Sequence, residues 1–289
     1  MATAIRLTDR GVLQVAGADR VAFLQGLVSN DVAKAAPDRA LFAAFLTPQG
    51  KFLHDFLIVD GGAALWLEMD AAALPDLLRR LRPYRLRAKV ELSDASAALA
   101  VAALIGPDAL AAVGLEGAAA GTAVARDGAV LLVDPRLADL GGRVIAPADA
   151  LEGVLDGLTT ARGTAEDYDA HRLALGVPDA RRDLEAEKST LLEADYDTLH
   201  AIAWDKGCYM GQELTARTKY RGLLKRKLVA VDLEGGLPEP GTPVMQGDKR
   251  VGEIRSGRGS RAIALMRLEA LDAADLTAGD TAVRPVAAT

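Results

Sequence analysis

The residues best suited to chemistry lie together in the eight-residue segment Lys206–Glu213, which contains the only cysteine of the chain, Cys208. Glycines at positions 207 and 211 allow sharp turns or a close approach to a ligand, and residues 214–217 are typical of the first turns of a helix. A thiol just before a helix N-terminus is stabilised as the thiolate, the nucleophilic and metal-binding form. We therefore predict a reactive thiol at Cys208, with Lys206 and Arg217 as cations beside it. Glu213 and Arg217, one turn apart, are expected to pair.

The alternative for this cysteine is a structural one, since a lone cysteine is most often a small buried apolar residue. The polar, glycine-rich neighbours of Cys208 make a functional loop as well supported as a structural cysteine. A single cysteine excludes an intrachain disulfide and indicates a reducing compartment. It also excludes a self-sufficient zinc or iron–sulfur site, because such sites need several thiolates or histidines. The three histidines, His54, His171 and His200, show no ligand spacing.

Charge is distributed unevenly along the chain. The net charge is −6, yet residues 206–261 contain twelve basic and six acidic residues. A second basic run occupies residues 79–89 and contains no acid. These runs are either solvated faces or a site for an anion, whether a polyanionic ligand tail, RNA or an acidic partner. Few aromatic residues accompany them, so stacking on single-stranded nucleic acid has weak support.

Composition indicates an ordinary globular protein of one large or two smaller domains, with 289 residues, half of them hydrophobic. The first residues lack the apolar core of a signal peptide, and the longest apolar run, 97–105, is too short to span a bilayer. We therefore expect a soluble, cytoplasmic protein.

Strands and helices mix without the regular alternation of a parallel α/β sheet, which indicates an α+β fold. Residues 5–7 and 12–15 predict a hairpin around Gly11, and residues 18–30 predict an amphipathic helix. Further helices are expected over 70–81, after Pro107, and over 148–158 and 164–175. Further strands are expected at 41–46, 52–59, 64–68, 89–92, 99–105, 123–125, 130–133 and 143–145. Four short strands at 228–233, 242–245, 250–256 and 261–266 predict a small antiparallel barrel. The predicted domains are residues 1–224 and 225–289.

Signatures of common catalytic sites, such as the P-loop, HExxH and GxSxG, are absent from the sequence. Three other places hold candidate binding residues. The turn at 47–50 leads to His54 and Asp55, either in a plain hairpin or in a loop that presents one of these side chains to a pocket, where Asp55 could bond the N–H groups of a heterocycle. Arg172 either compensates a helix dipole or faces a cavity. Glu193 is either a solvated residue or a cap.

Together these segments resemble the YgfZ family of folate-binding proteins, which is related to the aminomethyltransferase (GcvT, T-protein) of the glycine cleavage system. The specific element is Lys-Gly-Cys-Tyr-x-Gly-Gln-Glu at 206–213. Weaker elements occur in the expected order at 15–31, 46–51, 84–89, 172–178 and 215–217.

The resemblance implies a GcvT-like folate-binding fold of two interleaved α+β subdomains with a C-terminal barrel, and a central cleft that holds tetrahydrofolate. It implies a role in assembly or repair of iron–sulfur clusters, including those of radical enzymes that modify tRNA. The functional motif would then be Lys206, Gly207, Cys208, Tyr209, Gly211, Gln212 and Glu213. The folate contacts would be Asp55, Arg172, Glu193, Tyr209 and Arg217.

This sequence departs from the aminomethyltransferase pattern at two positions. Those enzymes carry an acidic residue where Cys208 stands, and their Arg-x-Glu-x-Gly element binds the folate ring through its glutamate, which Ala174 replaces here. Loss of a charged hydrogen-bond acceptor costs about 1.5–3 kcal/mol. Asp55 and Glu193 are the candidate substitutes.

The first functional hypothesis is a folate-dependent accessory factor for iron–sulfur clusters, not an independent enzyme. Cys208 would serve as a single iron ligand, completed by a partner, with assembly proteins or client enzymes as partners. We expect a monomer that makes no direct contact with nucleic acid or membrane. The alternatives are a folate-dependent aminomethyl transferase and a non-catalytic RNA- or protein-binding module.

Overall fold

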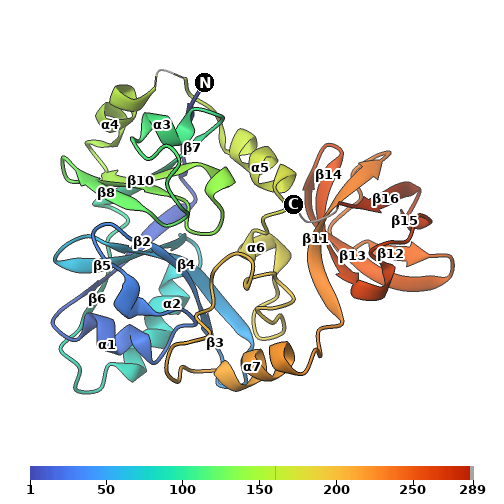
Figure 1. Cartoon of the computed structure of the whole chain (residues 1–289), viewed down its shortest axis with the longest axis horizontal. Coiled ribbons are helices and arrows are strands. Elements are labelled where there is room, and N and C mark those ends of the chain that lie inside the picture. The colour runs from blue at the N-terminus through green and yellow to red at the C-terminus, as the bar shows by residue number, and fades with distance from the viewer. Residues whose placement is uncertain (160, 287–289) are drawn as a thin grey trace.

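The computed structural model describes residues 1–159 and 161–286. Two five-stranded sheets form one part of the molecule, and a closed barrel lies to their side (Figure 1). Every strand pair within the sheets and the barrel is antiparallel. The predicted α+β class and the C-terminal barrel are therefore confirmed.

The first sheet has the strand order β3-β4-β5-β2-β6. All six residues of β3 are buried, because the helical side and the interior of the molecule each cover one face of this strand. Helices α1 and α2 cover the outer face, and Leu24, Leu74 and Leu77 pack into its hydrophobic cluster. The elements are β2 (Arg10–Ala16), α1 (Arg20–Gln25), β3 (Leu41–Leu46), β4 (Phe52–Asp60), β5 (Ala64–Asp70), α2 (Leu74–Leu81) and β6 (Glu91–Asp94).

The second sheet has the order β1-β7-β10-β9-β8. Helices α3 and α4 pack on its outer face through Val113, Leu151 and Leu155. Helix α5 begins with the predicted capping box, in which Thr164 and Asp167 exchange hydrogen bonds. The elements are β1 (Thr3–Arg6), β7 (Leu99–Ile105), α3 (Ala109–Ala112), β8 (Ala123–Arg126), β9 (Ala129–Val133), β10 (Gly142–Pro147), α4 (Leu151–Leu158) and α5 (Ala165–Ala174).

Two sequence-based expectations near the N-terminus are wrong. The strands of the expected hairpin exist, but β1 pairs with β7 in one sheet while β2 pairs with β5 and β6 in the other. The chain thus crosses between the sheets within its first sixteen residues, which interleaves the two α+β halves. The expected helix over 18–30 is only α1, because the chain beyond Gly26 turns to hydrogen-bond with distant segments, as when Ser29 Oγ donates to the carbonyl of Ala201.

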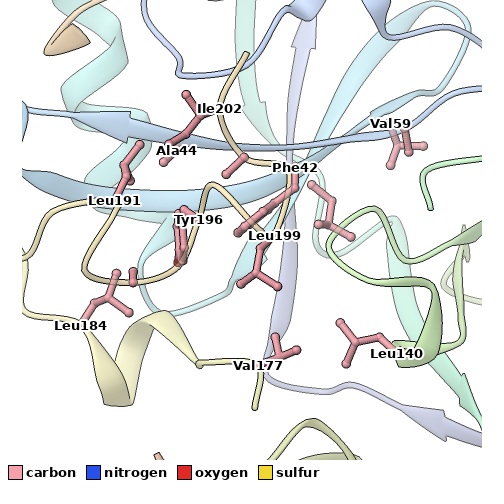
Figure 2. Packing of buried hydrophobic residues seen from close by; sticks show 14 of the residues in the cluster. Phe42, Ala44, Val59, Leu140, Val177, Leu184, Leu191, Tyr196, Leu199 and Ile202 are labelled. Atoms are coloured by element: carbon pink, nitrogen blue, oxygen red, sulfur yellow. The ribbon is translucent and has the colours of Figure 1, made fainter. Parts of the chain in front are cut away.

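The segment 184–202 contains no helix or strand and yet fills the space between the sheets. It follows α6 (Ala180–Asp183) and contributes eight buried residues to the largest hydrophobic cluster. Figure 2 shows the Tyr196 ring from this segment beside Phe42 of β3, and their ring centroids are 5.0 Å apart. Leu191 and Leu199 flank the same aromatic pair (Figure 2). This irregular segment closes the centre of the molecule.

Helix α7 (Gln212–Tyr220) leads from the sheets to the barrel, whose strand order is β11-β14-β13-β12-β15-β16 (Figure 1). Four strands lie where the sequence predicts them, and the last two were not predicted. The barrel strands are β11 (Arg226–Glu234), β12 (Pro243–Gln246), β13 (Lys249–Arg258), β14 (Arg261–Arg267), β15 (Leu276–Ala278) and β16 (Thr281–Pro285). Short 3-10 helices occupy Val32–Lys34, Arg82–Tyr84, Ala138–Leu140 and Leu268–Ala270. Within the described ranges, no helix has both the length and the apolar character needed to cross a membrane.

Candidate functional site

Cys208 lies in the loop 204–211 that precedes α7, and its side chain is exposed. The structure therefore places the thiol in a solvent-accessible loop and not in the apolar core. Gly207 beside it is also exposed, and a Cβ added there would meet no atom within 4 Å. The thiol is open to a reagent, a metal ion or a partner.

Lys206 anchors this loop to the chain at the end of α1. Its Nζ atom donates to the carbonyl oxygens of Gln25, Val28 and Asn30 at 2.8, 2.8 and 2.7 Å. These carbonyls lie at and beyond the C-terminal end of α1, where helix carbonyls lack intrahelical partners and a cation is favourable. Burial lowers the pKa of Lys206 to about 8, against the opposing effect of Asp31. The structure thus assigns this ammonium to backbone carbonyls and not to the thiol.

Backbone contacts hold the other end of the loop. Gly211 adopts φ +82°, and a Cβ there would lie 2.6 Å from the carbonyl oxygen of Thr47 and 2.9 Å from Gly50 Cα. The turn 47–50 therefore packs directly on the motif. The backbone N–H of Met210 donates to the carbonyl of Gly26 at 3.1 Å. Gln212 accepts from the N–H of Tyr209 at 3.2 Å and closes the loop on itself.

The other residues of the motif have different surroundings. Tyr209 is buried in the main hydrophobic cluster, and burial raises its pKa to about 12. Glu213 and Arg217 are exposed on α7, and the described residues contain no ion pair between them, contrary to the expected pairing. The loop thus presents its thiol while its tyrosine and lysine are turned inward.

Asp55 and Arg172, two of the predicted folate contacts, line the same small cavity at the centre of the molecule. Asp55 Oδ2 accepts a 2.6 Å hydrogen bond from the Tyr196 hydroxyl, and burial raises the pKa of this carboxyl. Arg172 donates to Asp169 at 2.7 Å, to Asp183 at 3.3 Å and to the hydroxyl of Ser256 at 2.9 Å. Both side chains are therefore already engaged with the protein.

More buried charge surrounds this cavity. Arg136 and Arg143 both donate to Asp134, at 2.8 and 2.7 Å, and to the Tyr168 hydroxyl, at 2.9 and 2.8 Å. Burial raises the pKa of Asp134, but its two arginines outweigh that effect and hold the pKa well below the usual range. Arg10 pairs with Glu68 next to this group. Arginine side chains and their carboxylates thus occupy much of the centre.

The space left at the centre does not fit tetrahydrofolate. The cavity measures about 90 Å³, whereas sites for organic ligands of this size usually have about 300–1,000 Å³. A volume of this order suits a few water molecules, at about 30 Å³ each. Ala174, which stands in place of the ring-binding glutamate, supplies no compensating acceptor.

The remaining predicted folate contacts do not converge on that cavity. Glu193 pairs with Arg226 at 2.6 Å, accepts from Thr190, and lines a separate groove of about 1,130 Å³ beside the barrel. Tyr209 and Arg217 line neither space. The structure therefore brings together only Asp55 and Arg172.

A third hollow, which the sequence analysis missed, lies next to the motif. It measures about 650 Å³, and its walls include Asn30, His200 and Trp204. Trp204 Nε1 donates to Asp197 at 2.7 Å, and Lys219 Nζ lies 4.2 Å from the centroid of the indole. The only sequence signal for it was the position of Trp204 two residues before Lys206.

Two known protein families match this chain, one in its N-terminal part and one in its C-terminal part. Residues 4–116 match the GCVT N-terminal domain family, and residues 225–288 match the family described as CAF17, C-terminal beta-barrel domain. These matches confirm the GcvT-like fold with its C-terminal barrel.

Two mammalian relatives match over most of the chain and have the same name. The mouse protein "Iron-sulfur cluster assembly factor IBA57, mitochondrial" is 32% identical, over 93% of this chain and 78% of its own length. The human protein of the same name is 33% identical, over 90% of this chain and 76% of its own length. These relatives are named IBA57, whereas the sequence analysis named the YgfZ family. The expected cytoplasmic location is contradicted, because these relatives are named as mitochondrial.

Among solved structures, the glycine cleavage system aminomethyltransferase T from Bartonella henselae superimposes with a TM-score of 0.79. The match covers 99% of this chain and 84% of that one, at 15% identity. At this identity the match shows a shared fold, and the predicted relation to the aminomethyltransferase fold is confirmed.

Proposed function

Because this chain belongs to the IBA57 family of iron–sulfur cluster assembly factors, we propose that it takes part in iron–sulfur cluster assembly through Cys208. The observation that carries this proposal is an exposed thiol on a loop fixed at both ends. A fixed backbone places the sulfur reproducibly, while its exposure leaves it open to a cluster held by another molecule.

In this proposal the cluster is cargo, and Cys208 supplies one of its ligands. Clusters are usually held by four cysteine thiolates, and the sequence contains one. The other ligands therefore come from a partner protein or from small thiols. The step forms one sulfur–iron bond as the thiol gives its proton to solvent and a partner thiolate leaves the iron, so that no electron changes hands.

Lys206, Gly211 and Gln212 act as positioning residues. Lys206 ties the loop to the end of α1, Gly211 allows its contact with the turn 47–50, and Gln212 closes the loop. None of the three needs to touch the cluster, because each acts by holding the backbone on either side of Cys208.

The finer expectations that follow from the resemblance also belong to this proposal. The partners would be iron–sulfur assembly proteins or client enzymes, among them radical enzymes that modify tRNA, and the protein would act as a monomer without contacting nucleic acid or membrane. We also propose residues 1–224 and 225–289 as the domains, which the start of β11 at Arg226 supports. An aminomethyl transferase and a non-catalytic binding module are the alternatives.

Tetrahydrofolate binding, which the resemblance implies, is not used in this proposal. The central cavity is too small for tetrahydrofolate, and Asp55 and Arg172, the two predicted contacts that line it, are engaged in hydrogen bonds and ion pairs. No step is therefore assigned to folate.

Replacement of the thiol tests the proposed function. In cells that lack their own copy of the protein, we expect Cys208→Ala to abolish rescue of iron–sulfur enzyme activities, because no other cysteine can replace it. The thermal unfolding of the purified variant should be unchanged, since the side chain is exposed. The matched control is Ser260→Ala, which removes an exposed hydroxyl from a turn of the barrel and should rescue fully. Full rescue by Cys208→Ala would refute the proposal.

A further inference from the structure

The loop that joins α2 to β6, residues 82–89, is unusually exposed for its composition. All six residues from Arg82 to Arg87 are exposed, and Leu86 at its tip is 89% exposed. Leu86 also has φ +41°, a conformation that costs a non-glycine residue of order 1 kcal/mol or more. The loop thus holds an apolar side chain in solvent, where it gains nothing from the protein itself.

Four cations flank that leucine in the sequence: Arg82, Arg85, Arg87 and Lys89. In the described part of the chain, none of these side chains forms an ion pair. The two arginines just before them behave differently, since Arg79 and Arg80 both pair with carboxylates. The loop therefore carries a local excess of positive charge, which the carboxylates of a partner could neutralise.

This loop lies next to the loop that carries the thiol. The hydroxyl of Tyr84 donates to Met210 Sδ at 3.3 Å, two residues beyond Cys208. The ring of Tyr84 packs against Phe45, with centroids 6.4 Å apart. Met210 and Ala88 pack against one hydrophobic cluster. The exposed cations, the exposed leucine and the thiol therefore border a common region of the surface.

We propose that the 82–89 loop is a docking surface for an acidic protein that carries the iron–sulfur cluster, and that it aligns this cluster with Cys208. This inference rests on the proposed function and adds the chemistry of the partner. Carboxylates on the partner would pair with the four cations and speed encounter. Leu86 would bury its side chain in the interface, where an apolar anchor contributes most.

A protein fits this surface better than RNA or a membrane does. The loop has one aromatic residue, Tyr84, whose ring packs on Phe45 and whose hydroxyl is bonded, so that it offers no platform for bases. Membrane-surface helices insert a broad apolar face, whereas this loop exposes a single leucine besides that tyrosine.

The test combines function and contact. The variant Arg85→Glu/Arg87→Glu should lower rescue of iron–sulfur enzymes about tenfold to a hundredfold, as expected for loss of electrostatic steering. Leu86→Ser should lower it separately. Thermal unfolding should not change, and Cys208 should remain open to alkylation. The matched control is Arg126→Glu, at the end of β8 in the other sheet, where an exposed arginine also has no ion pair in the described residues (Figure 1).

A photo-crosslinking amino acid at position 86, compared with one at position 126, then identifies the contact in cells. We expect an adduct with an acidic, cluster-binding protein that disappears in the Arg85→Glu/Arg87→Glu background. Full rescue by the double variant, or position-86 adducts that are absent or contain RNA, would overturn the inference. Loop-dependent sedimentation with vesicles of one part cardiolipin to four parts phosphatidylcholine would overturn it in favour of a membrane.

The two proposals fail separately in these experiments. If Cys208→Ala rescues fully, the function proposed for the thiol is wrong, and the crosslinks still decide whether the loop binds an acidic protein. If Cys208→Ala fails to rescue while Arg85→Glu/Arg87→Glu rescues fully, only the docking surface is wrong.

Discussion

The buried arginines at the central cavity are paired, whereas the arginines at the edge of the molecule formed by the 82–89 loop and the Cys208 loop are exposed. At the centre, Arg172 is 3% exposed and is bonded to Asp169, Asp183 and Ser256. At the edge, the arginines of the 82–89 loop are exposed and have no ion pair in the described residues. Arginine is thus neutralised by the protein's own carboxylates in one region and remains available for another molecule in the other.

Burial explains the contrast. A buried charge is costly unless it is paired and hydrogen-bonded, so that the centre must neutralise its arginines internally. An exposed charge remains solvated and can wait for a partner at little cost. The buried arginines at the centre therefore contribute to the stability of the fold, whereas the exposed arginines of the 82–89 loop remain available to a partner.

The largest effect on stability should come from the centre. Arg172→Ala would leave Asp169 and Asp183 short of a buried partner, and loss of one member of a buried ion pair costs about 3–5 kcal/mol. Urea unfolding measures this loss. The matched control is Arg181→Ala, an exposed arginine 3.6 Å from Asp70, which should change stability by about 0.5 kcal/mol or less. Equal effects of the two substitutions would end the distinction between centre and edge.

An intermediate effect is expected where the two regions meet, at Lys206. Lys206→Met removes the donor from three backbone carbonyls, and buried acceptors without partners cost about 1–3 kcal/mol. Because the loop is then freed, the rate of Cys208 alkylation should change as well. Lys34→Met is the control, since Lys34 is itself exposed and pairs with the half-buried Asp31 and the exposed Asp205. A Lys206 variant with normal stability and normal alkylation would show that other contacts hold the loop.

The smallest effect concerns acid stability at Asp76 on α2. Burial raises the pKa of Asp76, but hydrogen bonds from Arg80, Arg79 and His54 outweigh it and lower the pKa from 3.8 to about 2. A carboxyl whose pKa is lower in the folded state stabilises the protein above pH 4, and this contribution disappears as the pH falls from about 4 to 2.

Asp76→Asn should therefore flatten the pH dependence of stability within that window. Urea unfolding at pH 2.5, 4 and 7 measures it. An unchanged slope between pH 2 and 4 would contradict the assigned pairs of Asp76 with Arg79 and Arg80 within α2 and with His54 of β4.

Local patterns predicted much of the fold because they depend on neighbours in sequence. The apolar run 41–46 became β3, and the Thr164 capping box opens α5. The partners of β1 and β2 were not predictable in this way, because pairing depends on strands about 55 to 100 residues away. The irregular segment 184–202 gave no periodic signal, although it fills the core.

The sequence by itself determined the Cys208 motif, since the glycines that permit its turns and the start of the following helix lie within eight consecutive residues. Only the tertiary structure decided what surrounds that motif. Lys206 reaches carbonyls some 180 residues away in sequence, Tyr84 touches Met210 across 126 residues, and arginines from several strands and helices occupy the centre. Such contacts follow from the packing of distant elements, and a linear pattern carries no record of them.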